Sequence, residues 1–268
     1  MTPPVTLEVT DGVALLGLAR PERNNAVDLP LARALRDAVA EVAATPDVGA
    51  AVLFGHGEQF SVGGDLLAFA DAEAPGQFLA ELARTAHEAV LGLRSLTVPV
   101  VASVQGACAG AGIGFALSAD LVLAEHTARF VVAYTATGLS PDCGVSWALT
   151  RALGPARASD LILTNRKVEG TEAERIGLVS RAVAPGTARA EAVRLATALA
   201  RGPRRALAAS AGLVRRAVSE PLSGHLDAEA RSIAALIETP DGQEGVHAFL
   251  AKRTPRFTHT TAGAADHD

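Results

Sequence analysis

Short apolar runs alternate with helical periodicities along the first two thirds of the chain. Glycine, proline and polar residues bound these runs, and each has the length of a buried strand. The runs lie at residues 5–9, 13–18, 50–54, 98–104, 121–124, 130–134 and 178–183. The first two flank Asp11-Gly12, a dipeptide typical of two-residue β-hairpins. Strands that alternate with helices in this way predict an α/β layer architecture.

The segments between these runs place apolar residues on one helical face. Asp28 is a candidate N-cap with Pro30 in the first turn, and Leu31, Leu35 and Val42 then share a face. A short helix is expected after Asp65. Longer helices are expected at residues 77–96, 145–153 and 156–163.

From Thr187 onward the pattern is almost wholly helical, and prolines divide it into three or four segments. We therefore expect an α/β core at 1–186 that carries the site, a helical oligomerisation region at 187–257, and a disordered polar tail at 258–268. Apolar positions such as Leu226 and Ile233 exceed what one core needs, and they predict an interface with other copies of the chain.

One uncharged stretch, residues 98–120, combines a strand, a glycine turn and a helix that begins near Ala111. A proline, a glutamine and four glycines within it argue against a transmembrane span. Glycines let a backbone approach a ligand closely, and the start of a helix favours a negative charge. The stretch is therefore a candidate binding site for an anionic group.

Composition narrows the function classes. With 49% hydrophobic residues among 268, the chain can bury a sizeable core. A net charge of -5 and the absence of a basic run argue against nucleic acid and anionic membranes as partners. The N-terminus has neither a basic n-region nor an apolar h-region, so we expect a cytoplasmic protein. Cys108 and Cys143 give neither a disulfide framework nor metal-ligand spacing, so no metal is expected.

Two strand–turn–helix units, at residues 51–65 and in the central stretch, are candidates for an oxyanion site. If their turns meet, they offer two backbone N–H donors, and such a donor contributes ~2.7–4 kcal/mol to transition-state stabilisation. The sequence leaves open whether they meet. Asp142 is either a cap for the helix from Val145 or a carboxylate over an apolar pocket, where burial favours general-base chemistry.

Five motifs carry a resemblance to a known family. They are RPERNNA, FSVGGDL, VQGACAGAGIGFALSAD, GLSPDCG and EGVHAFLAKRTPRF, and the similarity spans residues 5–257. In this order and spacing they resemble the crotonase family of enoyl-CoA hydratases and isomerases. The resemblance implies a crotonase spiral of ββα units, a C-terminal helical trimerisation region, and a homotrimer or dimer of trimers. It also implies an acyl-CoA thioester substrate, with coenzyme A as part of the substrate and no tightly bound cofactor.

The resemblance also implies roles for particular residues. By position, the backbone N–H groups of Val62 and Ala111 would hold the thioester carbonyl. The implied substrate-binding residues are Arg23 at a phosphate, Ala26 at the adenine, the turn residues Val62, Gly63, Gly64 and Asp65, Ala111, and Phe249 and Lys252 of a neighbouring subunit.

Two departures from the family pattern favour one reaction. Enoyl-CoA hydratases carry two glutamates, and Gly114 and Tyr134 stand at those positions here. Neither residue can hold a water, deprotonate it and protonate the α-carbon, as a carboxylate pair does. We therefore expect hydration to be weak or absent. Asp142 remains as one acid in a segment similar to that of single-aspartate enoyl-CoA isomerases. One carboxylate suffices for a 1,3-proton shift, so the primary hypothesis is a Δ3,Δ2-enoyl-CoA isomerase.

Two alternatives stay open. Residues 161–181 resemble 4-chlorobenzoyl-CoA dehalogenases, in which the aspartate at the position of Asp142 is a nucleophile and a histidine lies where His87 does. Those enzymes have a tryptophan at the position of Ala86, and this chain is poor in aromatics. An acyl-CoA hydrolase would use Asp142 similarly, whereas His87 by itself is also typical of a solvated helix histidine. A further alternative, from another functional class, is that the chain binds acyl-CoA without catalysing a reaction.

Overall fold

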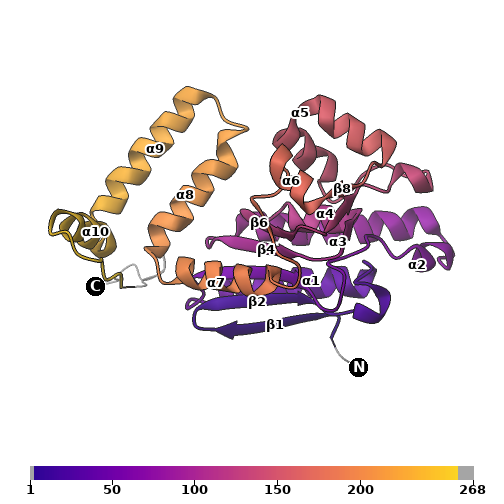
Figure 1. Ribbon diagram of the computed structural model, residues 1–268, viewed down its shortest axis with the longest axis horizontal. Coiled ribbons are helices and arrows are strands. Elements are labelled where there is room, and N and C mark those ends of the chain that lie inside the picture. Colours follow the sequence, from indigo (N-terminus) through magenta and orange to yellow (C-terminus); the bar gives the residue numbers. More distant parts are fainter. Residues whose placement is uncertain (1–2, 259–268) are drawn as a thin grey trace.

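The computed structural model describes residues 3–258 (Figure 1). Most of the predicted disordered tail, residues 259–268, lies outside this range. Thr258, where the tail is expected to begin, donates its backbone N–H to Oδ1 of Asp241 at 2.7 Å. Thr258 is therefore held by the fold, although the sequence assigns it to the disordered tail.

The predicted hairpin is confirmed and starts the main sheet. Strands β1 (Val5–Thr10) and β2 (Val13–Leu18) pair antiparallel. Asp11 and Gly12 between them have φ of 52° and 75°, and a type I′ turn requires positive φ at both central residues. The sheet order is β1-β2-β3-β4-β6-β9, parallel from β2 onward; the further strands are β3 (Ala50–Gly55), β4 (Val100–Val104), β6 (Leu121–Glu125) and β9 (Arg181–Val183).

A second, three-stranded sheet has the order β5-β7-β8. Its strands are β5 (Ala107–Ala109), β7 (Arg129–Val131) and β8 (Val168–Glu169). The chain from β4 runs through β5 into helix α4 (Ala111–Ala116), and the chain from β6 runs through β7 toward α5 (Val145–Thr164). Each of these units places one strand in each sheet and then adds a helix, which is the ββα arrangement that the resemblance implies.

Helices cover both faces of the main sheet. In β3, Ala51 and Leu53 pack toward α1 (Leu29–Ala44) and α3 (Pro75–Ser95). The alternate residues Val52 and Phe54 pack instead against the alanines of α7 (Ala188–Ala200). Because strand side chains alternate between faces, a continuous apolar run such as β3 is buried on both sides. The remaining segments are η1 (Pro21–Arg23), α2 (Leu66–Ala70), η2 (Thr135–Thr137) and α6 (Gly170–Ile176).

The packing of α7 changes the predicted division of the chain. The sequence assigns everything from residue 187 to a separate helical region, yet Ala192, Ala196 and Ala200 of α7 are fully buried or nearly so against the sheet. Helix α7 therefore belongs to the core. The separate helical part starts after Gly202 and contains α8 (Arg204–Ala217), α9 (Leu222–Ile237) and α10 (Pro240–Leu250).

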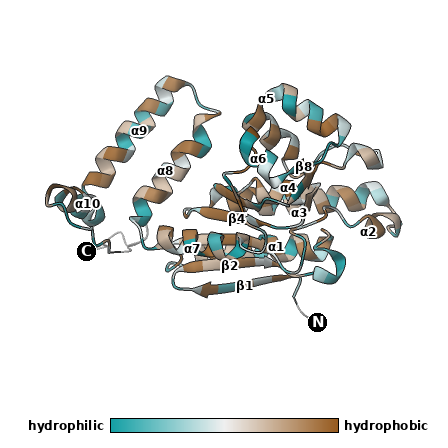
Figure 2. Cartoon of the chain, in the orientation of Figure 1, coloured by the Kyte–Doolittle hydropathy of each residue, from teal (hydrophilic) through white to brown (hydrophobic). Residues whose placement is uncertain are grey.

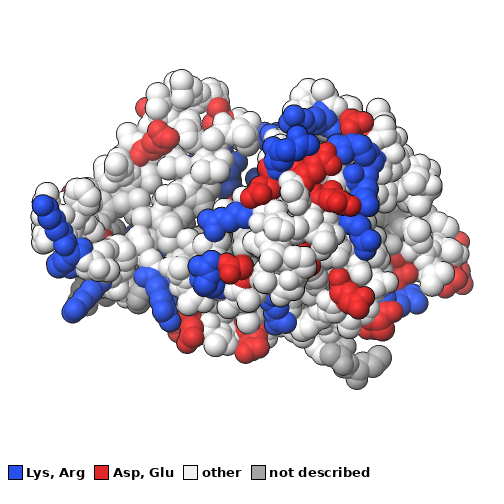
Figure 3. Space-filling model, in the orientation of Figure 1, with Lys and Arg blue, Asp and Glu red and all other residues white. Residues whose placement is uncertain are grey.

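Helices α8, α9 and α10 extend away from the sheets as an arm (Figure 1). Figure 2 shows hydrophobic residues along α8 and α9, and Val214, Leu222 and Ile233 are 73%, 72% and 72% exposed. The surface over this pair carries few charged side chains on the face drawn in Figure 3. Exposed apolar faces of this kind are typical of a surface that packs on another molecule. The expected homotrimer or dimer of trimers stays a prediction.

The central stretch is the buried middle of the molecule. Strand β4 and helix α4 have no exposed residue. Three-residue β5 lies between them and was too short to predict from an apolar run. Among residues 3–258, none of the helices has the length and apolarity needed to cross a membrane.

The predicted strand at 130–134 is wrong at its C-terminal end. Strand β7 stops at Val131, and Ala133 has a φ of 65°, which turns the chain out of the sheet. Tyr134 consequently lies at the start of η2 rather than in a strand. The two helices predicted at 145–153 and 156–163 are present as α5, with a break at Gly154.

Candidate active site

A cavity of about 360 Å³ lies at the N-terminal end of α4. Its wall combines the two glycine turns, one face of α3, and the segment from Val132 to Cys143. Most of the lining is apolar. Within the described part of the chain, Asp142 is the one charged side chain in this wall. A single carboxylate over an apolar surface is the setting that the sequence offered as the functional alternative for this residue.

The two glycine turns meet, which the sequence left open. The N–H of Ala109 donates to the carbonyl of Ser61 at 2.9 Å, so the first turn runs alongside β5. Gly63 has a φ of 88°, and a Cβ there would lie 2.9 Å from the carbonyl oxygen of Ala109. Only glycine permits this approach. As a result, the backbones of Val62 and Ala111 line the same cavity.

The two candidate donors differ in their present partners. The N–H of Ala111 has no protein acceptor among the hydrogen bonds of residues 3–258, and Ala111 lines the cavity. The N–H of Val62 donates to the carbonyl of Asn24 at 3.2 Å. An oxygen that accepts from both N–H groups would therefore have to share or displace the Asn24 carbonyl at Val62.

Asp142 does not cap the following helix. Helix α5 has Gly144 as its N-cap, and no side chain accepts a hydrogen bond there. The hydroxyl of Tyr134 instead donates to Oδ1 of Asp142. The side chain of Asp142 is thus not a helix cap, and Tyr134, which stands at one of the two positions that hold a glutamate in hydratases, contacts it directly.

Tyr134 should stay protonated well above its ordinary range. Burial raises the pKa of its hydroxyl, and the neighbouring Asp142 charge raises it further. It is the only tyrosine in the chain, so tyrosinate absorbance reports on it alone. We expect no tyrosinate signal from the folded protein at pH ~10, where an unperturbed tyrosine ionises. Since the unfolded chain loses this proton first, stability should fall as pH rises above that value. A folded-state titration near pH 10 would contradict this.

Gly114 is held against the turn that carries Asp142. A Cβ at Gly114 would lie 2.3 Å from the carbonyl oxygen of Cys143 and 2.7 Å from its Cβ. A side chain cannot occupy that position unless the turn moves. The position that holds a glutamate in hydratases is therefore filled, in this fold, by the backbone that presents Asp142.

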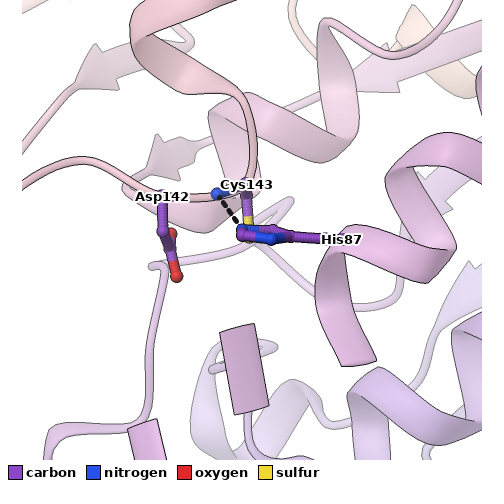
Figure 4. A group of neighbouring side chains, drawn as sticks. All are labelled: His87, Asp142 and Cys143. Atoms are coloured by element: carbon purple, nitrogen blue, oxygen red, sulfur yellow. Dashed lines mark hydrogen bonds between the residues drawn. The ribbon is translucent and has the colours of Figure 1, made fainter. Parts of the chain in front are cut away.

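His87 reaches the same turn from α3. The backbone N–H of Cys143 donates to its Nε2 at 3.1 Å, a contact between residues 56 apart in sequence (Figure 4). Ligand atoms of His87, Asp142 and Cys143 lie within 4.8 Å of one another. The Nε2 lone pair is already used, and burial, followed by the Asp142 charge, raises the pKa of the Cys143 thiol. Neither group is in the form that binds a cation, so the cluster does not fit a metal site.

Of the residues implied for coenzyme A, Arg23, Asp65 and Ala26 have partners within their own chain. Arg23 is 42% exposed and pairs with Asp65 at 3.2 Å. Burial opposes the charge of Asp65, but the Ala68 amide and the guanidinium groups of Arg23 and Arg20 hold its pKa below the ordinary value. The carbonyl of Ala26 accepts from Arg20 at 2.8 Å.

Two further candidates do not reach the cavity of their own chain. Phe249, at the end of α10, is 83% exposed, and neither it nor Lys252 belongs to the cavity wall. This placement fits residues that would act on a neighbouring subunit, as the resemblance implies.

The apolar wall of the cavity comes mainly from one face of α3, which includes Ala86. Leu79, Ala83 and Ala86 follow one another on one face of α3, and Phe69 of α2 completes the wall. Spacing of four and three residues puts them on a single face. The sequence did not predict the contact between His87 and Cys143, because no local pattern signals a hydrogen bond across 56 positions.

Comparison with known proteins identifies the family. The enoyl-CoA hydratase/isomerase family model matches residues 8–260. The chain belongs to the enoyl-CoA hydratase/isomerase family. A Rhodobacter capsulatus relative named "Probable enoyl-CoA hydratase" is 39% identical over 95% of this chain and 97% of its own length.

Other family members widen the range of reactions. The 1,2-epoxyphenylacetyl-CoA isomerase of Escherichia coli is 34% identical over 93% of this chain and 96% of its own. The crystal structure of an enoyl-CoA hydratase from Polaromonas sp. JS666 superposes with a TM-score of 0.89, at 34% identity, covering 94% of this chain and 99% of that one. The fold is therefore the crotonase fold of this family, whose members include both hydratases and isomerases.

Proposed function

We propose that this member of the family is a Δ3,Δ2-enoyl-CoA isomerase with Asp142 as its single acid and base. The observation that supports the proposal most is the cavity wall, where Asp142 is the one charged side chain in the described range and both glycine turns contribute to the lining. A 1,3-proton shift needs one group that accepts and returns a proton, and an enolate needs donors for its oxygen. The wall offers both.

In the proposed reaction, the N–H groups of Val62 and Ala111 hold the thioester oxygen of a 3-enoyl-CoA. Asp142 removes a proton from C2, and the electron pair passes into a dienolate whose oxygen carries the negative charge. The double bond forms between C2 and C3 when Asp142 returns the proton to C4. Tyr134 donates to Oδ1 of Asp142 and thereby holds the carboxylate in place.

The same wall argues against efficient hydration. A hydratase must hold a water, remove its proton and protonate the α-carbon, which a pair of carboxylates performs. The backbone around Gly114 leaves no room for a side chain. Tyr134 offers only a hydroxyl, and burial raises its pKa and keeps it protonated. Several relatives are named hydratases. The proposed distinction between isomerase and hydratase therefore rests on Gly114 and Tyr134 alone.

We further propose that the nucleotide end is closed by another subunit. Arg23 would turn from Asp65 to a phosphate, and Phe249 and Lys252 of a neighbour would cover the adenine beside Ala26. The exposure of Phe249 and of the α8–α9 faces supports a homotrimer or a dimer of trimers.

A substrate panel tests the proposal. The protein should convert a 3-enoyl-CoA to the conjugated 2-enoyl-CoA, which absorbs more strongly in the ultraviolet, and should leave 4-chlorobenzoyl-CoA unchanged. A covalent ester on Asp142, detected by mass spectrometry after incubation with the aryl thioester, would instead support a dehalogenase or hydrolase. Tight binding of every thioester without turnover would support a binding protein.

A further inference from the structure

The turn that presents Asp142 has an unusual backbone. Cys143 has a φ of 48° and Gly144 a φ of 72°, so two consecutive residues are left-handed. Glycine adopts that conformation freely, but a cysteine does so only where its surroundings hold it. The position of Asp142, one residue earlier, therefore depends on what fixes Cys143.

Two contacts fix Cys143 from opposite ends of its backbone. Its N–H donates to Nε2 of His87 at 3.1 Å. Its carbonyl packs against Gly114, where a Cβ would approach to 2.3 Å. The first contact, drawn in Figure 4, reaches the turn from α3, and the second reaches it from α4, so the turn is clamped between two helices of the core.

The hydrogen bond also determines the state of the imidazole. A backbone N–H can only donate, so Nε2 of His87 must carry a lone pair and the ring must be neutral with its proton on Nδ1. The nitrogen that faces the Cys143 backbone is thus occupied. In this geometry it is not available to take a proton from a water or a substrate.

We infer that His87 is a positioning residue: it accepts the Cys143 N–H and thereby aims Asp142 into the cavity, and it takes no part in proton transfer. The inference rests on the proposed role of Asp142. It differs from the role of a general base.

Two substitutions separate the roles. Gln places an amide oxygen where it can accept the Cys143 N–H, so His87→Gln should keep kcat for isomerisation within about threefold of wild type. Leu has no acceptor, so His87→Leu should lower kcat by roughly 10²-fold, the effect of a misplacement on the order of 1 Å. KM should change little in both, because the thioester donors are untouched. His126→Gln, at an exposed loop histidine, is the matched control.

The outcomes are distinct. If His87 were a base or acid, His87→Gln would lose as much as His87→Leu, roughly 10²–10⁴-fold, and the inference would be overturned. Full activity of His87→Leu would overturn it as well. A loss confined to His87→Leu, with rescue by Gln, is the expected result.

A second measurement does not depend on catalysis. NMR of nitrogen-labelled histidine should show the His87 ring neutral, with its proton on Nδ1 and Nε2 as an acceptor; the signal is assigned by its loss in His87→Gln. A charged ring, or a proton on Nε2, would overturn the inference even if the enzyme is an isomerase. The expected tautomer in a protein that does not isomerise 3-enoyl-CoA would leave the contact standing and reject the proposed function instead.

Discussion

Replacing Asp142 by Asn should lower kcat for isomerisation by roughly 10²–10⁴-fold, the usual contribution of a general acid or base. Asn has nearly the same size, and its amide oxygen can accept the Tyr134 hydroxyl in place of Oδ1. Since α5 takes no side-chain cap from Asp142, the helix should form as before. The substitution therefore removes the proton acceptor and little else.

Binding and exchange measurements separate chemistry from affinity in this variant. The dissociation constant for an acyl-CoA should change little, because Val62 and Ala111 still face the thioester. Exchange of the substrate's α- and γ-protons with deuterated water should be lost. Asp160→Asn, at a surface carboxylate paired with Arg166, is the matched control. Near-complete turnover and exchange in Asp142→Asn would leave the mechanism without a base.

Adding one methyl group at Gly114 should reduce kcat/KM by roughly 10²-fold. The new Cβ would lie 2.3 Å from the Cys143 carbonyl oxygen, so the turn must shift, and a shift on the order of 1 Å at a catalytic group has an effect of this size. Alanine is otherwise the better helix former by about 0.8–1.0 kcal/mol. A loss of activity without a matching loss of helix stability would therefore locate the effect in the turn.

Gly76→Ala is the control for that substitution. Gly76 lies in the first turn of α3, and a Cβ there meets nothing within 4 Å. Its activity should match wild type, and its melting temperature should be equal to or slightly above that of wild type. If Gly114→Ala were equally silent, the turn would have room to spare, and the argument that it excludes a glutamate from this position would fail.

Local chemistry made much of the fold predictable. Asp11-Gly12 can hardly be anything but a tight turn between two apolar runs, and Asp28 accepts the Leu31 N–H at 2.9 Å as an N-cap should. Two strands were not predicted, for a physical reason. Strand β8 has two residues and β5 three, which is too few for any periodicity to appear.

The site was predictable only as a set of residues. The motifs name Val62, Ala111 and Asp142, and all three line one cavity. The sequence could not predict their environment. The contacts that hold Cys143 join three separate elements. Local grounds favoured Asp142 as a helix cap, but its side chain instead accepts a hydrogen bond from the Tyr134 hydroxyl. Tertiary packing decides such contacts, and local preference does not report on it.

The most direct test of the single-carboxylate account compares two reactions of the same wild-type preparation. One is the isomerisation of a 3-enoyl-CoA, and the other is the hydration of crotonyl-CoA, each followed by ultraviolet absorbance. The account predicts that kcat/KM for isomerisation exceeds that for hydration by at least ~100-fold, because hydration lacks its second acid/base group. Comparable values would contradict the account and would require a second proton-transfer group in the cavity besides Asp142.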